Sequence, residues 1–61
     1  MNAAELAIVK RAIQTLRFEG KLHLSRTEIG QLIEELNQCR EYKLADYVRS
    51  MDPAQIAGLL R

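Results

Sequence analysis

Cysteine, histidine, proline and glycine are all scarce in this 61-residue chain, and the shortages exclude several kinds of protein. Cys39 is the only cysteine, so no disulfide can form within one chain. With His23 as the only histidine, the ligands for a closed zinc site are lacking. There is no glycine-rich phosphate loop, and no carboxylate pair or nucleophile-base pair has the spacing that catalysis needs. We therefore expect no metal, no cofactor and no enzymatic activity.

Long apolar stretches are missing as well. No run of about 18 apolar residues is present, which predicts that no segment spans a membrane. The N-terminus has no apolar stretch behind basic residues, which argues against a secretory signal. A chain with one cysteine and neither of these segments is expected in the reducing cytoplasm.

The residues that are present indicate one small folded domain covering positions 1–61. Hydrophobic residues make up 48% of the chain and interspersed charged residues 28%, a composition typical of a globular protein rather than a disordered one. A chain of this size buries only about 60% of the surface that its unfolded form exposes. With disulfides and metals excluded, association with a second copy or a partner protein is the remaining source of stability, and we expect a homodimer.

Charge is unevenly placed although the net charge is only +1. Residues 1–26 contain five basic and two acidic side chains, whereas residues 27–61 contain four basic and six acidic ones. This asymmetry fits complementary helices that attract each other, and it also fits a small basic face for nucleic acid. The candidate nucleic-acid contacts are Lys10, Arg11, Arg17, Lys21 and Arg26.

Two amphipathic helices are predicted, over about 3–19 and 26–50. Capping boxes open both, with Asn2 before Glu5 and Ser25 before Glu28. Gly20 suits the end of the first helix. The apolar residues with helical spacing are Leu6, Val9, Ile13 and Leu16 in the first helix and Ile29, Leu32, Ile33 and Leu36 in the second.

The second helix has no proline or glycine between Gln31 and Met51, which favours one long helix. A bend near Asn37 is the open alternative, because polar residues interrupt the apolar face beyond Leu36. Asp52 and Pro53 then predict the start of a short helix over about 54–60. The predicted fold is all-α: an antiparallel helical hairpin with a long second helix and a short C-terminal helix.

A second apolar face on the first helix predicts a binding surface. Its residues project away from the first stripe, and a helix that is apolar on two sides is buried on two sides. The C-terminal half of a long second helix would extend past the first helix and add to this surface. The candidate interface residues are Ala4, Ala7, Ile8, Phe18, Leu44, Tyr47 and Val48.

An alternative function is DNA binding by a helix-turn-helix unit. The stretch from Leu24 to Leu36 resembles the first helix of that motif. A turn and a basic recognition helix should follow. No glycine-containing turn follows Leu36, however, and residues 40–43 are mixed in charge, so we favour a protein-interaction module.

The residues Asn2-Ala3-Ala4 and the run Ile8-Val9-Lys10-Arg11-Ala12-Ile13 resemble small early proteins of lambdoid phages, encoded between the exonuclease and excisionase genes. The predicted first helix carries most of this resemblance. The resemblance implies a helical hairpin that dimerises. It also implies an accessory role in early infection, through contact with host or phage proteins that affects host functions or the choice between lysis and lysogeny.

Overall fold

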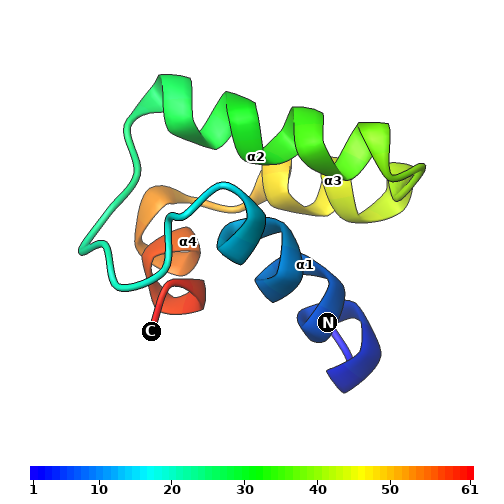
Figure 1. Cartoon of the computed structure of the whole chain (residues 1–61), viewed down its shortest axis with the longest axis horizontal. Coiled ribbons are helices and arrows are strands. Elements are labelled where there is room, and N and C mark those ends of the chain that lie inside the picture. Colours follow the sequence, from blue (N-terminus) through cyan, green and yellow to red (C-terminus); the bar gives the residue numbers. More distant parts are fainter.

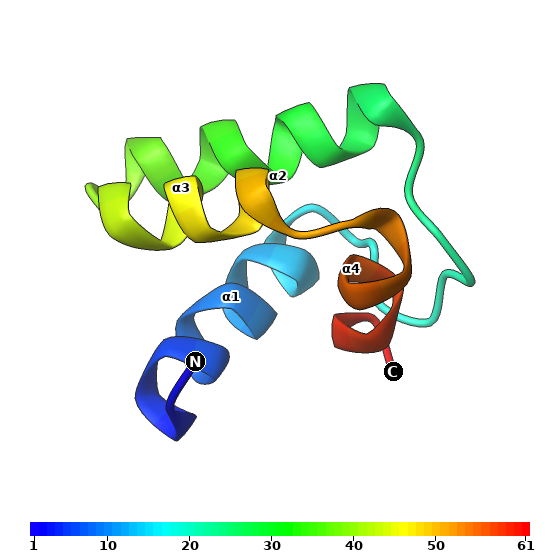
Figure 2. The same cartoon turned by 180° about the vertical axis from the view of Figure 1, so that it is seen from behind.

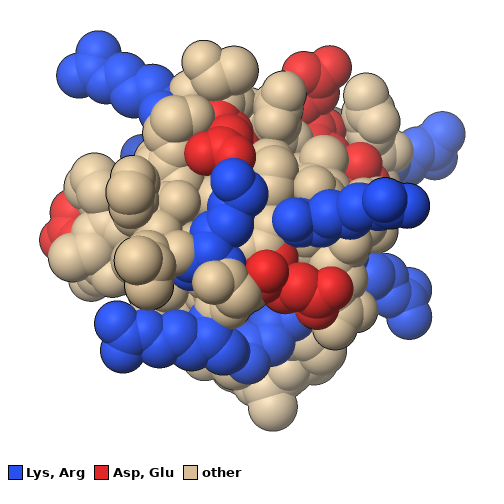
Figure 3. All heavy atoms as spheres, turned by 60° about the vertical axis from the view of Figure 1, so that its left-hand side comes forward, with Lys and Arg blue, Asp and Glu red and all other residues tan.

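The computed structural model describes all residues, 1–61, and contains four helices and no strands (Figures 1 and 2). The all-α prediction is confirmed. The helices are α1 (Ala3–Thr15), α2 (Arg26–Gln38), α3 (Tyr42–Ser50) and α4 (Pro53–Leu59). No helix combines the length and the apolar character needed to cross a membrane. Charged side chains of both signs cover the surface seen in Figure 3.

Three of the four helices begin with a capping box. The side-chain oxygens of Asn2, Ser25 and Asp52 accept hydrogen bonds from backbone N–H groups at 2.8, 3.2 and 3.0 Å, respectively. In each box the residue three positions later returns a bond to the backbone of the capping residue. Each box satisfies N–H groups that have no partner inside the helix. The predicted starts of these helices are therefore correct to within one residue.

Helix α1 ends at Thr15, four residues earlier than predicted. Arg17 adopts a left-handed backbone conformation with φ of 61°. The Phe18 N–H donates to the Ile13 carbonyl at 2.9 Å, and the Arg17 N–H donates to the Gln14 carbonyl at 3.0 Å. This bonding is a Schellman motif, and it reverses the chain so that Phe18 returns to the core.

The predicted long helix over 26–50 is wrong, because the chain breaks into α2 and α3 at residues 39–41. Arg40 is left-handed with φ of 62°, and a second Schellman motif forms there. The Glu41 N–H donates to the Leu36 carbonyl at 2.8 Å, and the Arg40 N–H donates to the Asn37 carbonyl at 3.0 Å. Helix α3 therefore folds back along α2 (Figures 1 and 2).

The most extensive helix packing is between α2 and α3, not between the two helices of the predicted hairpin. Helix α1 lies obliquely across this pair, and α4 lies beside the C-terminal end of α1 (Figures 1 and 2). A hydrogen bond of 3.0 Å from the Gly20 N–H to the Leu60 carbonyl joins the loop after α1 to the end of α4. Each helix therefore covers a different side of the same apolar core.

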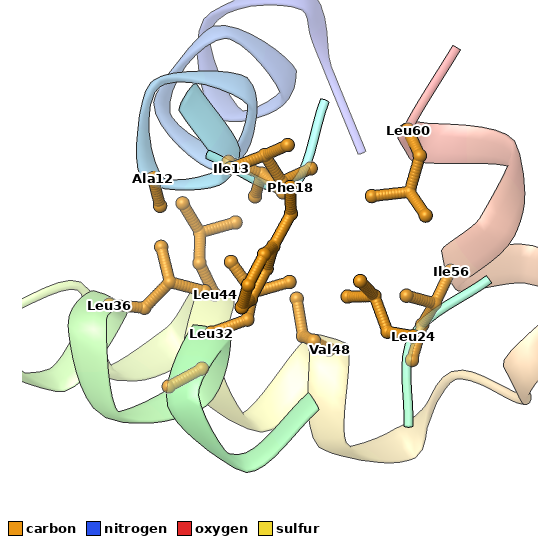
Figure 4. Packing of buried hydrophobic residues seen from close by; sticks show 12 residues of the cluster. Ala12, Ile13, Phe18, Leu24, Leu32, Leu36, Leu44, Val48, Ile56 and Leu60 are labelled. Atoms are coloured by element: carbon orange, nitrogen blue, oxygen red, sulfur yellow. The ribbon is translucent and has the colours of Figure 1, made fainter. Parts of the chain in front are cut away.

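All four helices contribute to a single apolar core, and Figure 4 shows their side chains converging. The predicted stripe residues Val9, Ile13, Leu32 and Leu36 are buried in it. The complete set of buried residues is Val9, Ala12, Ile13, Phe18, Leu24, Leu32, Leu36, Leu44, Ala45, Val48, Ile56 and Leu60. No buried side-chain polar atom lacks a hydrogen-bond partner, so the core carries no uncompensated polar group.

A matched pair of leucines tests this core. Leu44 is 3% exposed and Leu22 is 87% exposed. We expect Leu44→Ala to lower the free energy of unfolding by about 2–5 kcal/mol, because it removes buried methyl groups and leaves a cavity. Leu22→Ala should change it by less than about 0.5 kcal/mol. Urea unfolding of dilute protein measures both, and equal effects of the two substitutions would contradict the core.

Candidate protein-binding groove

Three of the predicted interface residues lie in the core. Phe18, Leu44 and Val48 are 6%, 3% and 0% exposed in the single chain. The prediction placed Phe18 on a surface because it extended the first helix to residue 19, and it placed Leu44 and Val48 there because it assumed a continuous helix over 26–50. The turn at Arg17 returns Phe18 to the core, and α3 folds back on α2, so all three side chains are buried within the same chain.

The other four predicted interface residues stay at or near the surface. Ala4 and Ala7 are exposed on α1, and Tyr47 is exposed on α3. Ile8 is partly buried and packs against the core. The structure therefore does not join all seven residues into one surface, but it places Ala7 and Ile8 together at the edge of a groove.

The groove lies between α1 and the turn that connects α2 to α3. Its volume is about 370 Å³, within the range of about 300–1,000 Å³ that is typical of ligand pockets. The apolar part of its lining consists of Ala7, Ile8, Ala12, Leu36 and Cys39. Its polar part consists of Arg11, Thr15, Glu35 and Glu41. The groove can accept an apolar side chain that has a polar or charged neighbour.

Carboxylates give one side of the groove a negative charge. Glu35 and Glu41 outnumber Arg11, the only basic residue in the lining. The C-terminal end of α2 lies at the same side, and its last turn contains no basic residue. The C-terminal end of a helix carries a partial negative charge, which adds to that of the carboxylates. This side of the groove therefore favours a cationic group over an anionic one.

The thiol of Cys39 lies in the groove as a weak hydrogen-bond donor. Its Sγ atom is 3.4 Å from Oε2 of Glu35. This hydrogen bond, together with desolvation and the negative charges of Glu35 and Glu41, raises the pKa of the Cys39 thiol. Because the thiolate is the reactive form, the environment of Cys39 disfavours nucleophilic chemistry. No three His, Cys, Asp or Glu side chains cluster as a metal site would require, in the groove or elsewhere.

The five predicted nucleic-acid contacts are all exposed. Arg11 lines the groove, whereas Lys10 lies on the flank of α1 toward α4, where its Nζ atom is 3.4 Å from the Arg61 carbonyl oxygen. Arg17 lies in the turn after α1, and Arg26 is the first residue of α2. The face seen in Figure 3 carries both basic and acidic side chains, with acidic groups between the basic ones.

Lys21 is already engaged within the chain. Its Nζ atom is 2.8 Å from Oε2 of Glu28 and 5.8 Å from the centre of the Phe18 ring. The hydrogen bond from Lys21, with a further one from the Ser25 backbone, lowers the pKa of Glu28 to about 2. The Lys21 ammonium is thus partly neutralised, which weakens its contribution to a basic face.

Glu35, Cys39 and Glu41 were not predicted as site residues. Glu35 lies on α2, which packs against α1, whereas Cys39 and Glu41 belong to the turn at residues 39–41, where the sequence predicted a continuous helix. The apolar second side of α1 was the one feature of the sequence that indicated this region, through Ala7 and Ile8.

Alkylation of Cys39 tests the environment of the groove. We expect the folded protein to react with iodoacetamide more slowly than the urea-unfolded chain at pH 8, because the raised thiol pKa reduces the thiolate fraction. Glu35→Gln should accelerate the reaction of the folded protein, since it removes the carboxylate that accepts the thiol proton. Equal rates for the folded wild-type protein and this variant would show that Glu35 does not control the thiol.

Comparison of the chain with protein-family models, with curated proteins and with solved structures finds no match. The resemblance of its N-terminal region to lambdoid phage early proteins therefore stays a prediction from sequence. The function of the chain has to be inferred from its own surface.

Proposed function

We propose that the chain is a non-enzymatic interaction protein that holds a segment of another polypeptide in the groove between α1 and the α2–α3 turn. The observation that supports this function is the groove itself, with Ala7, Ile8 and Leu36 as apolar lining and carboxylates at one side. The segment that fits best presents an apolar side chain next to a lysine or arginine.

The expected affinity follows from the size of the groove. Complete burial of one leucine-sized side chain contributes about 1.5–3 kcal/mol, and an exposed ion pair at the edge contributes at most about 1 kcal/mol. A single such anchor therefore corresponds to a dissociation constant of about 1 mM at best, and a partner that also covers neighbouring surface binds more tightly. The carboxylates contribute mainly selectivity and association rate.

The biological setting of this proposal comes from the resemblance to early proteins of lambdoid phages. In that setting the chain acts in the host cytoplasm, and its partner is a host or phage protein. Binding would modulate host functions or the choice between lysis and lysogeny.

A helix-turn-helix DNA-binding regulator is the second candidate function. One observation favours it: residues 39–41 form a short turn between two helices, although no glycine is present there. The exposed side of α3 is, however, mixed in charge, with Arg49 and Asp46 3.5 Å apart. A recognition helix for the major groove is usually richer in free basic side chains.

A peptide titration followed by backbone amide NMR tests the groove. We expect a short peptide with leucine between two lysines to shift the signals of Ala7, Arg11 and Cys39, and the same peptide with glutamates to shift them far less. Ala7→Lys should abolish the shifts, because it places a long cationic side chain in the groove. Ala4→Lys, on an exposed alanine outside the groove lining, is the matched control.

Three results would contradict the proposed groove: no shifts, equal shifts with both peptides, or loss of binding in the Ala4→Lys variant. A parallel titration with a DNA duplex addresses the second candidate. If the protein binds DNA with an affinity that falls steeply with salt, and if neither peptide binds in the groove, the regulator is favoured over the interaction protein.

A further inference from the structure

Leu22 is the most exposed large apolar residue of the chain, at 87%. It lies in the loop between α1 and α2. Leu24, two positions later, is buried, whereas Leu22 points away from the core. An isolated exposed leucine is common on protein surfaces, so its surroundings decide whether it has a role.

Several interactions fix the loop around Leu22. On one side, the Lys21 N–H donates to the Phe18 carbonyl at 3.2 Å, and the Lys21 ammonium pairs with Glu28. The neighbouring Gly20 N–H donates to the Leu60 carbonyl at 3.0 Å. On the other side, Leu24 is anchored in the core. A fixed loop loses little conformational entropy on binding, so the exposed leucine is preorganised for a contact.

The loop and the α2–α3 turn lie at opposite ends of α2 (Figure 1), and that turn borders the groove. Helix α2 contains 13 residues, which corresponds to a length of about 20 Å. The loop lies at its N-terminal end, which carries the partial positive charge of a helix, and the groove lies at its negative C-terminal end. The loop and the first turn of α2 contain three basic side chains, Arg17, Lys21 and Arg26, against two carboxylates, Glu19 and Glu28. The loop end therefore carries a small net positive charge, and the groove lining carries a small net negative charge.

We propose that a second copy of this chain occupies the groove, with Leu22 of one copy inserted between α1 and the α2–α3 turn of the next. This inference rests on the proposed function, because it uses the same groove and names its partner. Leu22 supplies the apolar side chain, and Arg26, which forms no ion pair within its own chain, supplies positive charge toward the carboxylates Glu35 and Glu41. The groove volume of about 370 Å³ is large enough for a side chain of this size.

The contact joins two different surfaces, so it is heterologous. A heterologous contact links copies head to tail and produces an open chain or a closed ring rather than ending at a symmetric pair. With one apolar anchor, the interface belongs to the small and transient class below about 1,200 Å². Association is therefore expected at high concentration, and salt should weaken it because both ends carry charge.

Two variants that each disable one end make the test specific. Leu22→Asp removes the inserted side chain and leaves the groove intact, whereas Ala7→Lys blocks the groove and leaves the loop intact. Both positions are exposed, so neither substitution disturbs the core. Ala4→Lys is the control for the charge added to α1.

Sedimentation equilibrium from about 10 µM to 1 mM measures the association. We expect the wild-type protein and the Ala4→Lys variant to form species larger than a dimer as concentration rises, and each disabled variant alone to remain monomeric. An equimolar mixture of Leu22→Asp and Ala7→Lys should form dimers and nothing larger, because only one intact contact can form between the two variants.

Three outcomes overturn the self-docking proposal: a wild-type protein that is monomeric at 1 mM, disabled variants that associate like the wild type, or a mixture in which no dimer forms. If self-docking fails while the lysine-flanked leucine peptide still binds the groove, the proposed function stands and the partner is a different protein. If the peptide also fails to bind, both the function and the self-docking are overturned.

Discussion

Two left-handed arginines determine the path of the chain through this fold. Arg17 and Arg40 each occupy the position after a helix C-cap, where a Schellman motif requires positive φ. A side chain in this conformation costs about 1–2 kcal/mol relative to a right-handed one. The cost is offset because the first turn returns Phe18 to the core and the second lets α3 fold back on α2. Without the second turn, Leu44 and Val48 would face solvent.

The same turn produces the surface on which function is proposed. When α3 folds back, the chain closes its core without a second copy, and the turn adds Glu41 to the groove lining that Glu35 of α2 also forms. The groove is thus a consequence of how α2 ends rather than a separate element. The loop before α2 is fixed by Leu24 and by the capping box at Ser25, so both ends of α2 present defined surfaces. The two ends of α2 therefore differ in shape and charge, and the proposed function uses these exposed surfaces.

Much of the fold could be predicted from sequence because its signals are local. Helix starts at Asn2, Ser25 and Asp52 are visible as capping boxes, and the core side of α1 and α2 follows from apolar spacing. The two helix ends were missed because left-handed C-caps are usually glycine, and here both are arginine. Ile13 and Phe18 have the apolar spacing that accompanies a Schellman motif, but Leu36 and Glu41 do not. The groove could not be predicted, since part of its lining is placed by that unrecognised turn.

The central claim is that the chain breaks at Arg40, and urea unfolding of Arg40→Gly tests it most directly. Glycine adopts positive φ without a penalty, so the substitution should leave the free energy of unfolding unchanged or raise it by up to about 1 kcal/mol. Glu34→Gly, at an exposed position inside α2, should lower it by about 1 kcal/mol. If Arg40→Gly lowers it as much as Glu34→Gly does, residue 40 lies within a continuous helix, and both the fold-back of α3 and the groove are wrong.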